Sequence, residues 1–188
     1  MRRIVRDERK MVKATGLIRR LIVTPSPGRI NEGRVLAGAV VIPCALGRNG
    51  VTHFKREGDG KTPAGRFVLT GGYWRQDRLR AAGAHSPLHP IKPHMGWCDD
   101  VDDANYNRPI RLPARARHEE LAREDSLYDI VLTLDHNQRP RVRGFGSAIF
   151  FHLTRGDHDP TAGCVAISRA HMLRLLPRLA RNCVMVIR

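Results

Sequence analysis

A histidine and a cysteine near the end of the chain are the residues whose types and spacing could do chemistry. In FFHLTRGDHDPTAGCVAIS, residues 150–168, His152 follows a run of β-forming residues and Cys164 follows Gly163. A thiol is an effective acyl acceptor only as the thiolate, and a nearby imidazole is its usual activator. A loop that turns back sharply at Gly163 could bring the thiol to the imidazole and aim backbone N–H groups at an oxyanion. The pattern therefore predicts a thiol acyl-transfer site.

Two other interpretations stay open on composition alone. Cysteine is among the most buried residue types and is usually inert, so Cys164 could be a core residue. A metal site is the second alternative, because Asp157, His158 and Asp159 stand between His152 and Cys164. Aspartates beside proline are, however, ordinary turn formers. We therefore expect no metal site here and expect His158 to face solvent.

The elements that must position these residues are mostly short strands. Runs rich in Val, Ile and Leu that end at Pro or Gly are typical of strands. Such runs occur at residues 17–25, 34–47, 67–74, 146–153 and 182–188. Residues 126–144 resemble a hairpin whose turn is HNQRP. Residues 75–114 are rich in proline and are expected to be irregular.

One segment has helical periodicity. Apolar residues recur on one face of residues 169–181, although Pro177 should bend or shorten the helix. Many short strands with few helices predict a mainly-β sandwich or barrel. The length of 188 residues suits one domain. We expect a basic N-terminal tail over 1–16 and one folded domain over 17–188.

Composition narrows the class of protein. The chain is 41% hydrophobic and 27% charged, which argues against wholesale disorder. Its net charge of +15 favours acidic partners, but no nucleic-acid recognition motif is visible and we expect no nucleic acid. GKT at 60–62 does not complete a phosphate-binding loop, because Lys55 stands where that loop needs glycine.

The N-terminal sequence and the cysteines bear on the compartment. MRRIVRDERKMVKATGLIRRLIV holds no apolar signal core, since Arg19 and Arg20 interrupt its last run. We expect no transmembrane segment and a cytoplasmic location for the chain as written, or a periplasmic one if its start lies upstream or its export is non-standard. The four cysteines form no CxxC pair and fit a reducing compartment. Cys44, Cys98 and Cys183 are expected to be structural.

Three blocks of the sequence, in order, resemble the L,D-transpeptidase catalytic domain family (YkuD-like). The signature residues of the last block are His152, Thr161, Ala162, Gly163, Cys164 and Val165. CALGRNGV…KREGDGKTPAGRF at 44–67 resembles the family's G…GDG.TP.G.F turn and strand. GWCDDVDDANYNRPI at 96–110 is similar to a branch with a long insertion before the last strands. The resemblance covers about 17–188 and implies the family's β-rich fold.

The resemblance implies a reaction on the stem peptides of bacterial peptidoglycan, without metal or organic cofactor. Cys164 would attack the carbonyl of a diamino acid linked to a terminal D-alanine, and His152 would pass the thiol proton to the departing amine. Backbone N–H groups of Gly163 and Cys164 would hold the oxyanion. An amine would resolve the thioester in transpeptidation. Water would resolve it in an L,D-carboxypeptidase of cytoplasmic peptidoglycan recycling.

Further residues are candidates for substrate binding. The stem peptide carries carboxylates, which basic side chains could bind, and aromatic side chains could line the groove. The candidates are Arg48, Lys55, Lys61, Arg66, Arg108, Trp97, Tyr106 and Thr161. Ala162 and Ala166 replace residues that are often polar in the family, which favours water as acceptor. A monomer is expected, and a non-catalytic module that binds peptidoglycan or nucleic acid is the alternative of another class.

Overall fold

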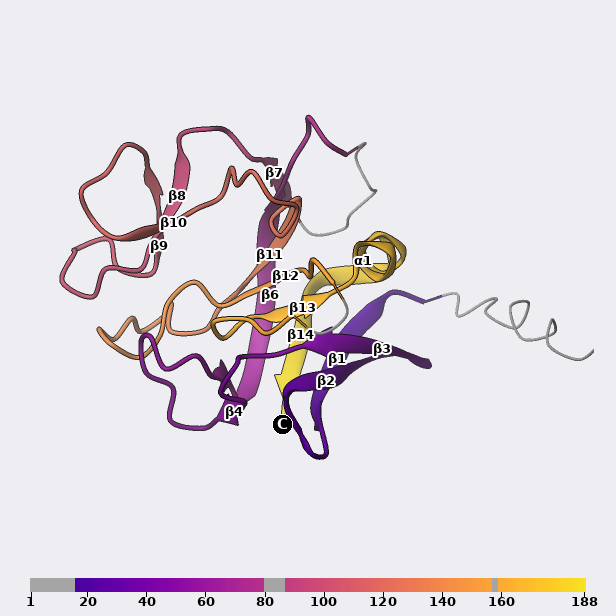
Figure 1. Cartoon of the computed structure of the whole chain (residues 1–188). Helices are drawn as coiled ribbons and strands as arrows, with labels where there is room; N and C mark the ends of the chain where they lie inside the picture. The colour runs from indigo at the N-terminus through magenta and orange to yellow at the C-terminus, as the bar shows by residue number, and fades with distance from the viewer. Residues whose placement is uncertain (1–15, 80–86, 157–158) are drawn as a thin grey trace, which may run out of the picture.

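The computed structural model describes residues 16–79, 87–156 and 159–188 (Figure 1). Its elements in chain order are β1 (Ile18–Ser26), β2 (Arg29–Ala37), β3 (Val40–Ala45), β4 (Val51–Thr52), β5 (Thr62–Pro63), β6 (Gly65–Trp74), β7 (Leu88–Pro90), β8 (Met95–Cys98), β9 (Arg108–Arg111), β10 (His118–Glu120), β11 (Ile130–Leu134), β12 (Phe150–Leu153), β13 (Val165–Ile167), α1 (Arg169–Leu175), the 3₁₀-helix η1 (Leu176–Arg178) and β14 (Leu179–Ile187).

Among the described residues, eight strands close into a mixed β-barrel in the order β11-β12-β13-β3-β2-β1-β14-β6. The barrel closes because β6 pairs with β14 through its first half and with β11 through its second half. The pairs β1–β14 and β12–β13 are parallel, and the other neighbours in the barrel are antiparallel. Closure leaves no free sheet edge between these strands. The predicted mainly-β, barrel-like fold with few short helices is confirmed.

Side chains on the strands beside the predicted site alternate between two hydrophobic clusters. On β12, Phe151 and Leu153 pack in the barrel core, whereas Phe150 belongs to a second cluster outside it. On the neighbouring segment, Val165 packs in the barrel core and Cys164 belongs to the outer cluster. Because successive strand residues point to opposite faces, the residues that alternate with core positions all face outward.

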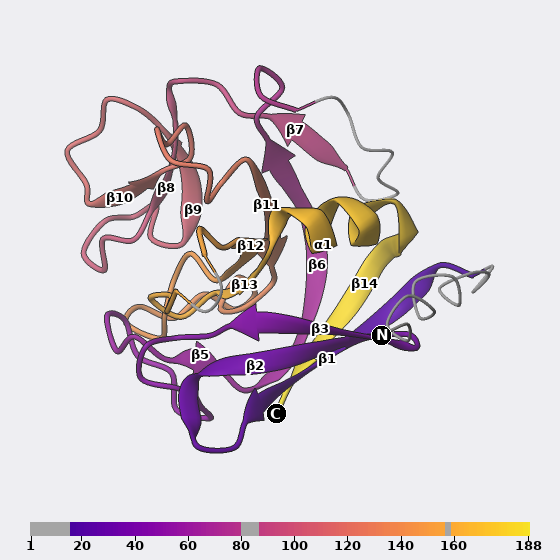
Figure 2. The same ribbon diagram turned by 45° about the vertical axis from the view of Figure 1, so that its right-hand side comes forward.

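A small three-stranded sheet, in the order β10-β8-β9, covers this outer face. Figures 1 and 2 show it beyond β11, on the side of the barrel away from β1 and β2. The outer cluster joins it to the barrel and consists of Ile91, Trp97, Leu121, Tyr128, Val131, Phe150 and Cys164. Residues 75–114, which were expected to be irregular, therefore contain β7, β8 and β9 in the described part of that range.

The hairpin predicted over 126–144 is wrong in its second strand. β11 forms, but both of its edges are already paired, one with β12 and one with β6. The chain after it closes into a loop instead. The Asn137 side chain donates to the Val142 carbonyl at 2.8 Å and accepts the Val142 N–H at 2.8 Å, which takes the place of a strand ladder.

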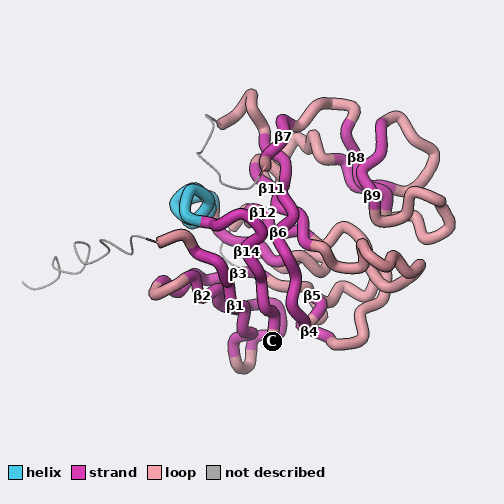
Figure 3. Tube along the Cα trace, turned by 180° about the vertical axis from the view of Figure 1, so that it is seen from behind, coloured by secondary structure: helices cyan, strands magenta, loops and turns pink. Residues whose placement is uncertain are grey.

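The predicted helix over 169–181 is real but shorter. Ser168 caps α1 by accepting the His171 N–H, and Pro177 stands in the 3₁₀ turn that ends the helical segment. The chain then continues from Leu179 as β14. Figure 3 shows α1 at the side of the strands, where its buried Met172 packs on the barrel core. Within the described ranges, no helix has the length and apolar character that crossing a membrane requires.

Candidate active site

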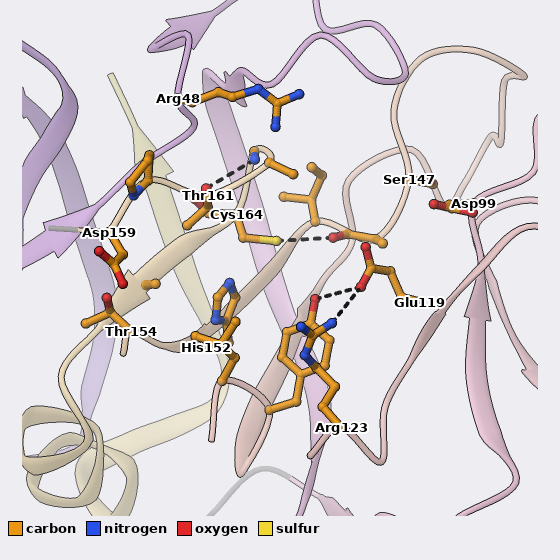
Figure 4. Close-up of a pocket in the computed structure, with 18 of the residues that line it drawn as sticks. Arg48, Asp99, Glu119, Arg123, Ser147, His152, Thr154, Asp159, Thr161 and Cys164 are labelled. Atoms are coloured by element: carbon orange, nitrogen blue, oxygen red, sulfur yellow. Dashed lines mark hydrogen bonds and ion pairs between the residues drawn. The ribbon is translucent and has the colours of Figure 1, made fainter. Parts of the chain in front are cut away.

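A cavity of about 660 Å³ opens between the outer face of the barrel and the segments that cover it (Figure 4). Its walls come from the loops around Arg48 and Lys55, the segment 147–149, the end of β12, the loop before β13, and the covering segments around Glu119 and Arg123. Both His152 and Cys164 line it. The segments are far apart in sequence, so only the closed barrel and its covering sheet bring them together.

Cys164 lies immediately before β13, beside the start of β12. Its sulfur accepts the Phe150 N–H at 3.3 Å, and its S–H donates to the Ala148 carbonyl at 3.3 Å. Phe150 and His152 share the outward face of β12, because their neighbours Phe151 and Leu153 point into the core. Thiol and imidazole therefore enter the cavity from adjacent, paired strands, as Figure 4 shows.

The imidazole of His152 is fixed in one tautomer. Its Nδ1 lies 2.7 Å from the Leu153 carbonyl oxygen, which can only accept, so Nδ1 carries the proton. Nε2 is then the nitrogen that can accept a proton. Burial lowers the pKa of His152 to about 4, so the ring is neutral near pH 7. The Tyr128 ring packs against it edge to face, with centroids 5.2 Å apart.

The resting thiol is also neutral. Burial raises the pKa of Cys164 to about 12, against the opposing effect of the Phe150 N–H. Among the hydrogen bonds of the described residues, none joins the thiol to His152. The thiol instead donates its hydrogen bond to the Ala148 carbonyl. The site is therefore a neutral thiol beside a neutral base, and the two act as a pair only after the S–H turns from Ala148 to the imidazole.

The carbonyl that holds the thiol belongs to a strained residue. Ala148 has φ +50, a left-handed conformation that is costly for a residue with a side chain. Asn107 maintains it: its Oδ1 accepts the Ala148 N–H at 3.1 Å and the Trp97 indole N–H at 3.0 Å. The covering sheet thereby fixes the backbone next to Cys164.

Comparison with known proteins identifies the family of the chain. The model of the L,D-transpeptidase catalytic domain family, YkuD, matches residues 22–187. The chain belongs to this family. No match was found among curated proteins or solved structures. Membership implies L,D-transpeptidase-type activity on peptidoglycan peptides.

Several residues that the sequence predicted do line the cavity of this L,D-transpeptidase domain. They are His152, Cys164, Gly163, Thr161, Arg48 and Lys55. Thr161 holds the turn before Cys164, since its hydroxyl donates to the Cys164 carbonyl at 2.7 Å and accepts the Gly163 N–H at 3.1 Å. Of the two N–H groups predicted to hold an oxyanion, that of Cys164 has no acceptor among the described residues. The catalytic roles themselves stay predictions.

Other predicted residues do not line the cavity. Trp97 and Tyr106 are buried behind it, with 5% and 1% of their surfaces exposed. Tyr106 donates a hydrogen bond to Glu57, whose carboxylate also accepts the Ser147 hydroxyl at 2.7 Å. These two aromatic residues therefore support the wall of the cavity.

The remaining basic candidates, Lys61, Arg66 and Arg108, are likewise absent from the lining. Arg66 and Arg108 are exposed on β6 and β9. Asp157 and His158 lie outside the described residues. Asp159 lines the cavity. No three Cys, His, Asp or Glu side chains in the described part of the chain form a group that could hold a metal ion.

The covering segment supplies charged residues that sequence analysis missed. The Glu119 carboxylate lies 3.4 Å from the Tyr128 hydroxyl and 3.7 Å from the Arg123 guanidinium. Burial raises the pKa of Glu119, with Arg123 opposing it. The stretch RHEELARED at 117–125 mixes both charges without periodicity, so no signal in it distinguishes residues that face the cavity from surface residues.

The buried imidazole predicts a specific pH dependence of stability. The pKa of His152 falls from 6.5 to about 4 on folding, so the unfolded chain binds more protons between these values. The free energy of unfolding should therefore drop as the pH falls through this window, by up to about 3 kcal/mol. Urea unfolding at several pH values measures it. A His152→Gln protein should lack this component, and equal pH dependence in both proteins would contradict the assignment.

Proposed function

We propose that this protein catalyses cysteine-dependent acyl transfer on peptidoglycan stem tetrapeptides, as an L,D-transpeptidase with Cys164 as nucleophile and His152 as base. One observation carries the proposal. The pairing of β12 with β13 brings a buried imidazole, whose Nδ1 is bonded to the Leu153 carbonyl, and a buried thiol into one cavity. Family membership supplies the substrate class.

The first half-reaction forms a thioester. The Cys164 proton moves from its hydrogen bond with Ala148 to Nε2 of His152, and the sulfur attacks the carbonyl carbon of the diamino acid. The Cys164 N–H would donate to the oxyanion that develops. The bond to the terminal D-alanine then breaks, and His152 returns the proton to the departing amine. The acyl group remains on sulfur.

The neutral resting state has a mechanistic consequence. Because burial disfavours charge on both the thiol and the imidazole, the ion pair of thiolate and imidazolium forms mainly as the substrate arrives. Leu153 steadies the imidazolium, since its carbonyl oxygen accepts the Nδ1 proton at 2.7 Å. The Ala148 carbonyl keeps the thiol protonated between turnovers.

Charged groups on opposite walls fit the two ends of a stem peptide. Arg48 lies at the rim of the cavity and, among the described residues, forms no ion pair, so it is available to a substrate carboxylate (Figure 4). Glu119 and Asp99 line the wall supplied by the covering segment. Glu119 would suit the amino group of an acceptor or of the diamino acid.

Hydrolysis of the same thioester is the second candidate function. Ala162 and Ala166 both line the cavity, so these two positions offer no polar side chain to hold an amine acceptor. Water needs no such holding group. An L,D-carboxypeptidase that releases terminal D-alanine from recycled tetrapeptides would act in this way.

Replacing the nucleophile tests the covalent mechanism. The Cys164→Ala protein should lose measurable turnover of a disaccharide tetrapeptide, because no thioester can form. Its thermal unfolding should remain cooperative, since alanine fits where the thiol lies. Mass spectrometry of the intact wild-type protein with substrate should show an acyl adduct that the variant lacks. Full activity in Cys164→Ala would show that the covalent mechanism is wrong.

Replacing Arg48 tests donor recognition. The Arg48→Gln protein should have a KM for the tetrapeptide that is raised about tenfold, equivalent to ~1.4 kcal/mol of lost binding, with little change in kcat. Arg34→Gln is the matched control, because Arg34 is an exposed residue of β2 outside the cavity lining. Equal KM values for both variants would remove Arg48 from the binding site.

The products of the reaction show whether an amine or water accepts the acyl group. With an added D-amino acid, we expect the wild-type protein to form exchanged tetrapeptide in addition to tripeptide. The Glu119→Gln protein should show a severalfold lower ratio of exchanged product to tripeptide, because the carboxylate that attracts the amine is gone. Mass spectrometry at a fixed donor concentration measures this ratio. Tripeptide as the only product of the wild type would establish hydrolysis.

A further inference from the structure

A buried lysine that neither the thiol chemistry nor the family signature accounts for lies beside the nucleophile. Lys55 is only 7% exposed, yet it lines the cavity that contains Cys164. Its stem runs along backbone that has no side chain in the way: a Cβ added to Gly146 would lie 2.8 Å from Lys55 Cγ and 3.0 Å from Cε. Any larger residue at Gly146 would displace the lysine.

The ammonium group of Lys55 lies against the turn that presents the nucleophile. A Cβ added to Gly163, the residue immediately before Cys164, would lie 3.3 Å from Lys55 Nζ. The same Cβ would lie 2.7 Å from the Lys61 carbonyl oxygen. The glycine therefore allows the cation to approach the backbone at which negative charge develops during acyl transfer.

Asp59 is the counter-ion of this lysine. Its carboxylate forms an ion pair with Lys55 and accepts the N–H groups of Arg56 and Lys61, each at 2.8 Å. Burial raises the pKa of Asp59, but these hydrogen bonds and the ammonium outweigh burial and lower it overall. The Asp59 carboxylate is thus held as an anion beside the lysine. The ion pair lies in the loop between β4 and β5, with its positive end toward Cys164.

Apart from Arg48, which lines the cavity and forms no ion pair with the described residues, the other charges around Cys164 are unfavourable to a thiolate or already neutralised. His152 is neutral and Tyr128 is a buried phenol whose pKa burial raises. Glu119 raises the pKa of the thiol, whereas Lys55 lowers it. Arg123 is paired with Glu119 and Asp125, and the carboxylate of Glu57 is bonded to two hydroxyl groups.

We propose that Lys55 and Asp59 form a charge couple that stabilises the thiolate of Cys164 and the oxyanion formed from it, with Lys55 supplying the stabilising charge and Asp59 limiting it. Lys55 keeps all its protons throughout, because the thiol proton goes to His152. Lys55 is thus a positioning residue that acts through its field on Cys164. The inference rests on the proposed role of Cys164 as nucleophile.

The direction in which each variant changes the alkylation rate of Cys164 distinguishes an electrostatic role of the ion pair from a structural one. Lys55→Met leaves the Asp59 anion near Cys164, so alkylation of Cys164 by iodoacetamide at fixed pH should slow by about tenfold. Asp59→Asn leaves the ammonium without its counter-ion, so the same alkylation should quicken severalfold. An ion pair that served only to order the loop would give changes in the same direction, because both variants break it.

The experiment uses the full chain, and mass spectrometry locates the adduct on each cysteine across a pH series. Lys55→Arg should restore most of the rate, because the charge is kept. Arg56→Met is the matched control from the same loop, outside the cavity lining, and should change the rate less than about twofold. Cys44, Cys98 and Cys183 are buried, so their modification would report loss of the fold in any variant.

The outcomes distinguish the two levels of inference. A wild-type Cys164 that resists alkylation at every pH, in a folded protein, would contradict its role as nucleophile. A reactive Cys164 with no shift in Asp59→Asn, or with slower alkylation in both variants, would overturn the charge couple alone. Opposite shifts in the two variants, with rescue by Lys55→Arg, would support it. If Lys55→Met does not fold, the near-isosteric Asp59→Asn decides by the direction of its shift.

Discussion

The parallel pairing of β12 with β13 is the interaction on which the site depends. It sets Phe151 opposite Val165 and His152 opposite Ala166, and so brings the segment before β13 beside the start of β12. The Phe150 N–H, at the edge of this pairing, is then able to bond the sulfur of Cys164. Because Phe151, Leu153 and Val165 are anchored in the barrel core, the outward residues between them have little freedom. The positions of the thiol and the imidazole are therefore fixed by the packing of their neighbours in the barrel core.

The covering sheet gives this strand pair its chemical environment. It buries the outer face, which makes His152 and Cys164 neutral at rest by withdrawing water from both. It also supplies Asn107, which holds the left-handed Ala148 whose carbonyl binds the thiol. A bare barrel would present the same two residues to solvent, with a more easily ionised thiol and a freely protonated imidazole. The covering sheet therefore changes the ionisation of His152 and Cys164, although neither residue belongs to it.

Burial on this scale has a cost that the loops around the site offset. A thiolate is disfavoured in a poorly solvated cavity unless positive charge or N–H groups face it. The Phe150 N–H bonds the sulfur, and the ammonium of Lys55, in the role proposed for it, would meet the same need from a second segment. Glycine at 146 and 163 is what lets the lysine lie there, since a Cβ at either position would press on it. The GDG segment has a physical role in this loop, because its Asp59 pairs with Lys55 and accepts the Lys61 N–H.

The sequence by itself determined the class of fold, and it predicted a pair, His152 and Cys164, that the structure places in one cavity. Runs rich in Val, Ile and Leu that end at Gly or Pro are local signals, and they predicted strands at β1, β6, β12 and β14. The single run predicted at 34–47 covers the end of β2 and all of β3. The spacing around His152 and Cys164 is also local, because strand, turn and nucleophile are contiguous in the chain. The second strand of the predicted hairpin does not form, and the reason is non-local. Both edges of β11 are already paired, one with β12 and one with β6, which are not its neighbours in a hairpin.

Only the tertiary structure decided which charged and aromatic residues reach the cavity. Trp97 and Tyr106 carry the right chemistry for a groove, yet they lie behind its wall, whereas Lys55 and Glu119 face it. Nothing in the neighbouring residues distinguishes these cases, because the direction of a loop side chain depends on what packs against it. The charges, tautomer and pKa values of the site were likewise beyond the sequence. They arise from burial and from hydrogen bonds between segments that meet only when the barrel closes and its covering sheet is in place.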